Sequence, residues 1–217
     1  MSGKVAWNIF RPMVTAKRVF RLKLPMQNSR TSEVVSFPPS VNAIGHVFWL
    51  FGLSGAGKST LAEALRRDLL FRNARGVLML DGDRLRSGLN QGLGFSDEDR
   101  DENLRRAAEV ARLGVENGLT VIAAFITPRE EQRRRVEEIV GADRISMVYI
   151  DSPLAVCRQR DVKGLYARAD VGEIKKMTGL GSRFELPINA ALVLQTNQEA
   201  PPESAARLAA FAQLQLP

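Results

Sequence analysis

The stretch "WLFGLSGAGKST", residues 49–60, decides the fold of this chain. An apolar run ends at Phe51, and residues 52–59 match G-x-x-x-x-G-K-[ST], the phosphate-binding P-loop pattern. An amphipathic stretch follows directly, so the motif lies between a buried strand and a helix, as a P-loop requires. The alternative is a glycine-rich turn with an ordinary lysine, but a complete match to the pattern is rare by chance. The stretch therefore predicts a site for a nucleoside triphosphate.

Each part of this motif suits the binding of phosphate groups. Gly52, Gly55 and Gly57 permit a tight turn, in which backbone N–H groups and the helix N-terminus point at the phosphates. Lys58 is expected to reach the β- and γ-phosphates, and Ser59 is expected to bind Mg²⁺. The motif thus predicts ATP and Mg²⁺ as cofactors. The predicted ATP-binding residues of the motif are Gly52, Leu53, Ser54, Gly55, Ala56, Gly57, Lys58, Ser59 and Thr60.

Length and composition favour a single domain in a reducing compartment. A chain of 217 residues with 45% hydrophobic content can bury one sizeable core. Its one cysteine, Cys157, cannot form an internal disulfide, and there is no Cys/His cluster typical of structural zinc. No apolar run approaches the roughly 18 residues that a membrane span needs. We therefore expect a cytoplasmic protein without a membrane partner.

The positive charge is confined to the start of the chain. The net charge is +7, and residues 1–30 hold seven of the 31 basic residues and none of the 24 acidic ones. The rest of the chain is neutral, so nucleic acid is not an expected partner. Residues 1–44 are predicted to be a basic N-terminal extension, and residues 45–217 the domain. The extension is interpreted as variable sequence or an early start codon, while an organelle transit peptide stays an alternative.

From His46 onward, short apolar runs alternate with amphipathic stretches. Strands are predicted over residues 46–51, 77–80, 119–125, 145–150 and 192–194. Helices are predicted over residues 59–73, 97–117, 129–140, 153–160 and 201–213. Because the strands are continuous apolar runs, both of their faces are expected to be buried. The sequence therefore predicts an α/β fold: a three-layer sandwich of the P-loop NTPase type, with a five-stranded parallel sheet and helices on both faces.

Two carboxylates follow the second predicted strand, in "LMLDGDRLRSGL" at residues 78–89. Asp81 and Asp83 would lie at the edge where open α/β sheets bind ligands. One could hold Mg²⁺ through water, and the other could accept a proton from an attacking hydroxyl. The alternative is an Asx turn around Gly82, a common reason for this pattern at a strand end. Behind a P-loop, the functional interpretation is favoured.

The run "LGFSDEDRDENLRRAAEVARL", residues 93–113, predicts a helix with Ser96 as N-cap. The acids of its first turn suit the helix dipole, which is a sufficient structural reason for them. Arg100, Asn103 and Arg106 then recur on one side of the helix. Two arginines and an amide would suit a doubly anionic ligand. From spacing alone, however, a solvated charged face is the favoured interpretation.

The chain resembles the adenylyl-sulfate kinases (APS kinases) from Val47 to about Thr196. The resemblance lies in five segments: "GLSGAGKST", "LDGDRLRSGLNQGLGFSDEDRDENLRR", "AAFITP", "SPLAVCRQRDVKGLY" and "GEIKKMTG". It implies an ATP-dependent kinase that transfers the γ-phosphate to the 3′-hydroxyl of adenosine 5′-phosphosulfate (APS). The product would be PAPS, the activated sulfate donor of sulfate assimilation. The resemblance also implies a homodimer and, in some settings, association with an ATP sulfurylase.

The same resemblance implies roles for individual residues. Asp83 looks like the carboxylate that serves the 3′-hydroxyl, and we assign Asp81 to the metal beside Ser59. Thr127 stands where the family usually has a serine described as an active-site residue, and Arg160 matches a position near ATP. Residues 158–184 look like a mobile lid over both nucleotides. The acceptor contacts implied are Asp83, Arg86, Phe95, Arg100, Asn103, Ile126, Thr127, Lys163 and Phe184.

Three departures from the family pattern concern the acceptor side. Arg84 stands where the family usually has Asn, Ser87 where it has His, and Asp170 where it has Arg. Two alternatives therefore stay open. One is a divergent kinase for another small acceptor, such as a sugar acid, and the other is a nucleotide-binding regulatory module without turnover. Whether Thr127 can carry phosphate is likewise open.

Overall fold

The structure, a computed structural model, describes residues 45–72, 76–173 and 177–216. The predicted basic extension, residues 1–44, lies outside the described residues, so its role stays a prediction. Within the described part of the chain, no helix combines the length and apolarity needed to cross a bilayer.

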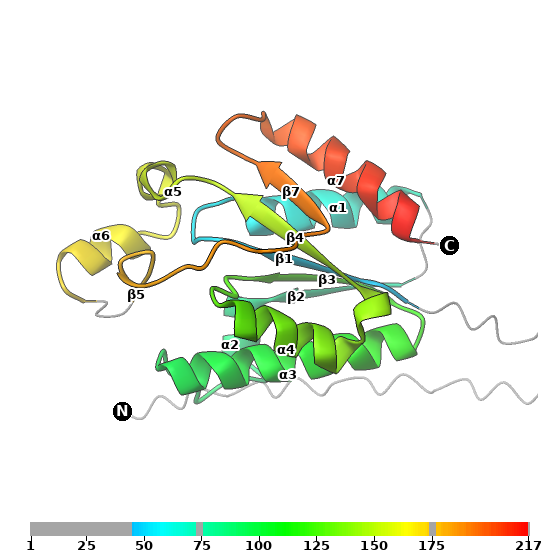
Figure 1. Cartoon of the computed structure of the whole chain (residues 1–217), viewed down its shortest axis with the longest axis horizontal. Coiled ribbons are helices and arrows are strands. Elements are labelled where there is room, and N and C mark those ends of the chain that lie inside the picture. The colour runs from blue at the N-terminus through cyan, green and yellow to red at the C-terminus, as the bar shows by residue number, and fades with distance from the viewer. Residues whose placement is uncertain (1–44, 73–75, 174–176, 217) are drawn as a thin grey trace, which may run out of the picture. The chain divides into compact units, whose positions relative to one another are not determined.

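A five-stranded parallel sheet forms the centre of the domain, as the sequence predicted (Figure 1). Its strand order is β2-β3-β1-β4-β7, so the strand before the P-loop is the middle one. Every neighbouring pair is parallel, which brings the carboxyl ends of all five strands to one edge. The strands are β1 (Val47–Phe51), β2 (Val77–Asp81), β3 (Thr120–Phe125), β4 (Ile145–Asp151) and β7 (Leu192–Gln195).

Both faces of β1 are fully buried, which explains its uninterrupted apolar sequence. Trp49 and Phe51 point into one core cluster, where Trp49 stacks on Phe125 with 4.9 Å between ring centroids. Phe48 and Leu50 point into the other cluster, on the opposite face. The alternation of side chains along a strand thus supplies two hydrophobic cores from one short segment.

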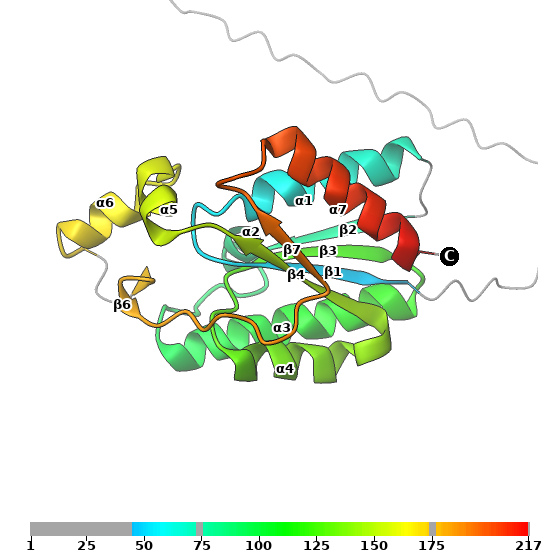
Figure 2. The ribbon, with the colours of Figure 1, turned by 45° about the horizontal axis from the view of Figure 1, so that its top comes forward.

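Helices cover both faces of the sheet (Figures 1 and 2). α1 (Lys58–Phe71) and α7 (Pro201–Gln215) pack on one face, and α3 (Asp97–Glu116) and α4 (Glu130–Val140) pack on the other. The predicted α/β sandwich is therefore confirmed, and the predicted helix and strand ends lie within about two residues of the observed ones.

Several short elements were not predicted as such. They are α2 (Gly82–Arg86), the 3₁₀-helix η1 (Ala142–Arg144), α6 (Leu165–Asp170), β5 (Met177–Thr178) and β6 (Gly181–Ser182), whereas α5 (Leu154–Arg160) was expected. Single side chains cap two of them. Asp81 accepts from the backbone N–H groups of α2, and Asp161 accepts from those of Tyr166 and Ala167 in α6. Elements of two to six residues carry too little periodicity to be recognised in sequence.

The segment 158–184 is attached to the rest of the domain through Tyr166. Tyr166 of α6 is buried in the core on the α1 face, and its hydroxyl donates to the carbonyl of Ser54 over 3.0 Å. One aromatic side chain therefore fixes α6 against the P-loop. Whether the predicted lid moves stays a prediction.

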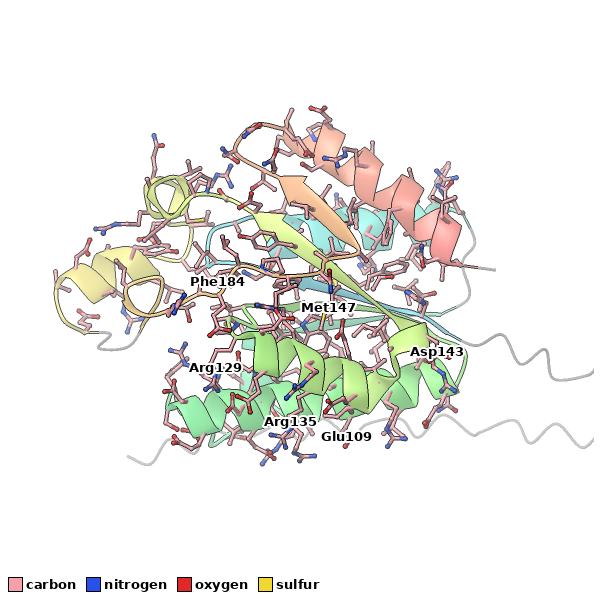
Figure 3. The ribbon with its side chains drawn as sticks, in the orientation of Figure 1. Glu109, Arg129, Arg135, Asp143, Met147 and Phe184 are labelled. Atoms are coloured by element: carbon pink, nitrogen blue, oxygen red, sulfur yellow. The ribbon has the colours of Figure 1, made fainter. Side chains whose placement is uncertain are left out.

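Arg133 of α4 is a buried cation that joins three parts of the chain. Its guanidinium donates to the carbonyls of Thr127 and Glu185, both over 3.0 Å, and to the Glu130 carboxylate over 2.8 Å. It also lies 5.1 Å from the centroid of the Phe51 ring. The residues after β3 and those before β7 are therefore held together through one side chain. Figure 3 shows Phe184, next to Glu185 in the chain, close to the start of α4.

Replacing Arg133 with Met should lower the free energy of unfolding by about 2–4 kcal/mol, because two buried carbonyls lose their donors. Urea denaturation measures this loss. Arg134→Met is the matched control on the same helix, because the Arg134 side chain is 71% exposed. The control should change stability by less than about 0.5 kcal/mol. Equal losses in the two variants would contradict this account of Arg133.

Candidate active site at the carboxyl edge of the sheet

The candidate site begins at the N-terminus of α1. Gly57 is the N-cap residue, no side chain caps the helix, and its first turn holds no acid. α3 differs, because the Ser96 hydroxyl caps it and Asp97, Glu98 and Asp99 occupy its first turn. The positive end of α1 is thus left for an anion from outside the helix, which is what a phosphate-binding helix needs.

Two glycines of the motif are required by geometry. A Cβ on Gly52 would lie 2.4 Å from the Ile150 carbonyl oxygen, in the neighbouring strand β4. Gly55 has a φ of 78°, and a Cβ there would lie 2.8 Å from the carbonyl oxygen of Cys157. The loop therefore packs against β4 and α5 at distances that only glycine permits.

Lys58 lies beneath this loop with its amine turned toward backbone oxygens. The amine donates to the carbonyls of Gly52 over 2.9 Å and Leu53 over 2.7 Å. Burial is the main cause that lowers the pKa of Lys58 to about 8, and the positive charge of Lys163 is the second cause. A bound anion would favour the charged amine, so the site gains electrostatic complementarity when phosphate is present.

Ser59 and Asp81 form the pair predicted for the metal. The Ser59 hydroxyl donates to Oδ2 of Asp81 over 3.0 Å, while Oδ1 accepts from the backbone N–H of Asp83 over 3.0 Å. The turn interpretation of the D-G-D pattern is therefore confirmed, since one oxygen caps α2, and the other oxygen faces the P-loop, where the functional interpretation stays a prediction. Mg²⁺ keeps several waters and needs only one or two protein ligands. The pair fits that requirement, although the described residues contain no cluster of three or more His, Cys, Asp or Glu.

Asp83 lies two residues beyond the metal pair, at the start of α2. Its carboxylate is exposed and contacts the amine of Lys163 from the segment between α5 and α6. Residues 80 positions apart in the chain thus meet beside the P-loop. Both were predicted for the acceptor side, and the structure places them together.

Arg86, Phe95 and Arg100 form the next group of predicted acceptor residues. The guanidinium of Arg86 donates to the carbonyls of Leu93 and Gly94, and lies 4.6 Å from the centroid of the Phe95 ring. Arg100 donates to the Phe95 carbonyl over 3.1 Å and to the Thr178 hydroxyl over 2.9 Å. The Phe95 side chain is 67% exposed, so one face remains open to a flat ligand. Both arginines shape the loop that presents this ring.

Ile126 and Thr127 follow β3, and the Thr127 side chain is buried. The Ile126 carbonyl accepts from the N–H of Gly52 over 3.3 Å, which joins this position to the P-loop. Thr127 is 1% exposed, and its hydroxyl accepts from the Trp49 indole over 2.9 Å. Its φ of 42° turns the side chain into the core. The Thr127 hydroxyl therefore anchors the end of β3 in this structure, and its role toward a ligand stays a prediction.

Phe184 and Arg160, which were predicted to contact ligands, also hold parts of the protein together. Phe184 stacks on Tyr149, with 5.9 Å between ring centroids, and lies against Arg133. Arg160 donates to the Thr196 carbonyl over 2.6 Å and to the Gly55 carbonyl over 3.4 Å. It thereby links the P-loop to the end of β7.

Three side chains around the site were not predicted. Thr196 donates its hydroxyl to the Ala56 carbonyl over 2.8 Å, Trp49 holds Thr127, and Arg133 holds the segment containing Phe184. Each lies at a strand end or in the core, and its contact depends on strand order. A threonine two residues after the predicted strand 192–194 was the only available signal, and it is a weak one.

Two of the three departures from the family pattern, Asp170 and Ser87, have local hydrogen-bond partners. Asp170 receives two hydrogen bonds from Arg158, at 3.0 and 2.8 Å, so its negative charge is paired. The Ser87 hydroxyl donates to the Arg84 carbonyl at the end of α2. The Arg84 side chain is exposed, and nothing in the structure explains its charge.

Comparison with known proteins identifies the family. The family model for adenylylsulphate kinase matches residues 44–195. An adenylyl-sulfate kinase of Phocaeicola vulgatus is 51% identical over 156 residues, covering 71% of this chain and 75% of its own. One from Paraburkholderia xenovorans is 51% identical over 168 residues, covering 77% and 93%.

A solved structure supports the same identification. The APS kinase of Mycobacterium tuberculosis, in complex with AMPPNP and APS, is 40% identical with a TM-score of 0.73, covering 78% of this chain and 98% of its own. This chain is therefore a member of the adenylylsulphate kinase family.

Proposed function

We propose that this chain transfers the γ-phosphate of ATP to the 3′-hydroxyl of adenosine 5′-phosphosulfate, giving PAPS and ADP. The observation that carries the proposal is the position of Asp81. Its carboxylate faces Ser59 of the P-loop through one oxygen and caps α2 through the other, and Asp83 follows two residues later. Asp81 and Asp83 thus connect the P-loop, which would bind the triphosphate, with the part of the site that would bind the acceptor hydroxyl.

The residues of the P-loop hold the donor. Backbone N–H groups at the start of α1 bind the phosphate oxygens, and the Lys58 amine moves from the loop carbonyls to the β- and γ-phosphates. Ser59 and Asp81 would hold Mg²⁺, Asp81 through water. When bound, this ion neutralises charge on the β- and γ-phosphate oxygens. Arg160 positions the loop through Gly55.

The α2–α3 loop and the segment 158–184 hold the acceptor. The open face of Phe95 stacks on the adenine, and Arg86, Arg100 and Asn103 line the anionic part of the ligand. Lys163 lies against Asp83 and neutralises its charge where an anionic ligand approaches. Phe184, held by Tyr149 and Arg133, bounds this side.

Phosphoryl transfer then follows from positioning. The 3′-oxygen forms a bond to the γ-phosphorus as the bond from that phosphorus to the β–γ bridging oxygen breaks. ADP leaves with the electron pair, and the hydroxyl proton passes to the Asp83 carboxylate. The homodimer, the association with an ATP sulfurylase and the cytoplasmic location stay predictions.

A product assay separates this proposal from its two rivals. Protein mixed with ATP, Mg²⁺ and APS should yield equal amounts of PAPS and ADP by chromatography, and Lys58→Ala should abolish both. Arg67→Ala on the same helix is the control, because its side chain is 76% exposed and it should keep full activity. ADP without PAPS would mean hydrolysis or another acceptor. ATP binding without either product would favour a regulatory module.

The pKa of Lys58 predicts the pH dependence of kcat/KM for ATP. The amine is charged below a pH of about 8 and loses its charge above it, so kcat/KM should fall as pH rises through that value. Asp81 and Asp83 oppose the shift, and Lys163 adds to it. Lys58→Arg should abolish the decline, since a guanidinium does not titrate in this range. An identical decline in Lys58→Arg would show that another group causes it.

Asp83→Asn tests the proton acceptor while keeping the side chain's size and its oxygen toward Lys163. We expect kcat to fall by about 10²–10⁴-fold, with little change in the KM for ATP. Asp68→Asn, at the far end of α1, is the carboxylate control, since its side chain pairs with Arg72 on the surface of that helix. A kcat within about twofold of the parent enzyme would exclude Asp83 as the base.

A further inference from the structure

Asn90 and Asn103 form a buried side-chain pair behind the acceptor side of the candidate site. Nδ2 of Asn90 donates to Oδ1 of Asn103 over 2.8 Å, and both side chains are buried. The backbone of Asn90 is held separately, since its N–H donates to the Leu85 carbonyl and its carbonyl accepts from the N–H of Leu93. The position of Asn90 in the loop therefore does not depend on its amide.

The amide of Asn90 is costly to the fold. Asn90 is fully buried, and its Oδ1 has no hydrogen-bond partner among the described residues. A buried polar atom without a partner destabilises the folded state. A leucine of similar size would fill the same space without an unpartnered oxygen of its own, although Oδ1 of Asn103 would lose its donor. Packing and loop conformation therefore do not account for an asparagine here.

The one side-chain hydrogen bond that Asn90 makes to a described residue orients the Asn103 amide. Because Oδ1 of Asn103 accepts from Asn90, its Nδ2 is directed to the other side. No described residue accepts a hydrogen bond from that Nδ2. Asn103 lies three residues after Arg100 on α3, so both side chains lie on one side of the helix. Arg100 itself is bonded to the carbonyl of Phe95.

We propose that Asn90 is a positioning residue that holds the Asn103 amide with its N–H₂ group toward the acceptor nucleotide. Without Asn90, the Asn103 amide could rotate and present its oxygen, an acceptor that repels phosphate and sulfate oxygens. Asn90 acts only through Asn103 and touches neither nucleotide. The inference rests on the proposed function, because Asn90 would orient a residue that we propose to contact the acceptor.

The test is the KM for APS in Asn90→Leu. We expect it to rise about tenfold, the equivalent of one hydrogen bond to a charged ligand, with the KM for ATP within twofold. The thermal midpoint should change little, because the unpartnered oxygen of Asn90 is removed while Oδ1 of Asn103 loses its donor. Asn90→Ala removes the same donor with a smaller side chain and should give the same rise in KM. Gln91→Leu, at the exposed neighbouring position, is the control and should leave both KM values unchanged.

A double-mutant cycle with Asn103→Ala completes the test. Asn90→Leu should add nothing to the KM for APS once Asn103 is Ala, because the first residue acts through the second. Additive effects, or an unchanged KM for APS in both Asn90 variants, would overturn the inference while the enzyme still makes PAPS. If the parent enzyme makes no PAPS, the proposed function fails and this inference fails with it, so the two failures are distinguishable.

Discussion

The central position of β1 in an all-parallel sheet is the constraint on which the rest of the structure depends. Since β1 pairs with β3 on one side and β4 on the other, the loop after it is contacted from both neighbours. The N–H of Gly52 reaches the carbonyl of Ile126, and a side chain at Gly52 would collide with Ile150. The P-loop is therefore a rigid turn between fixed strand ends, and a rigid turn keeps its N–H groups directed at one point.

Strand order also explains which residues meet at the site. β7 lies beyond β4, and Thr196 at its end donates to the Ala56 carbonyl. β2 lies beyond β3, yet Asp81 at its end bonds to Ser59 at the start of α1. The edge of the sheet is narrow enough for side chains from both outer strands to reach the loop after the middle one. The turn that carries Asp81 and Asp83 can thus serve both sides of the proposed site, the ATP side and the acceptor side.

The cations of the site shape its walls as well as carrying charge. Arg86 and Arg100 hold the loop that presents Phe95, and Arg160 holds the P-loop to the end of β7. Arg133 holds the segment containing Phe184 from a buried position. A guanidinium has five donors in a fixed plane, so it can bond to backbone carbonyls and still present charge or a flat face. Because one arginine can do both, the sequence alone could not tell which arginines contact a ligand and which hold the backbone.

Much of the fold could be predicted from the sequence because its signals are local. A fully buried strand is a continuous apolar run, and the long helices α1 and α3 have apolar residues at helical spacing. The P-loop pattern is contiguous, and so is D-G-D at the end of β2. Short elements such as α2 and α6 were missed, because single capping side chains stabilise them. The burial of Tyr166 could not be predicted, because it depends on contact with the P-loop, and the neighbouring sequence is mostly charged.

The sequence by itself determined the parallel α/β architecture and the P-loop, and it supplied the residues that we propose for the acceptor. Only the tertiary structure decided how those residues are used. It turned the Thr127 hydroxyl into the core against Trp49 and paired Asp170 with Arg158, and it left an oxygen of Asn90 without a partner among the described residues. The physical reason is that a side chain's role depends on what lies opposite it. For these residues the opposite group is 12 or more positions away in the chain, where no local pattern records it.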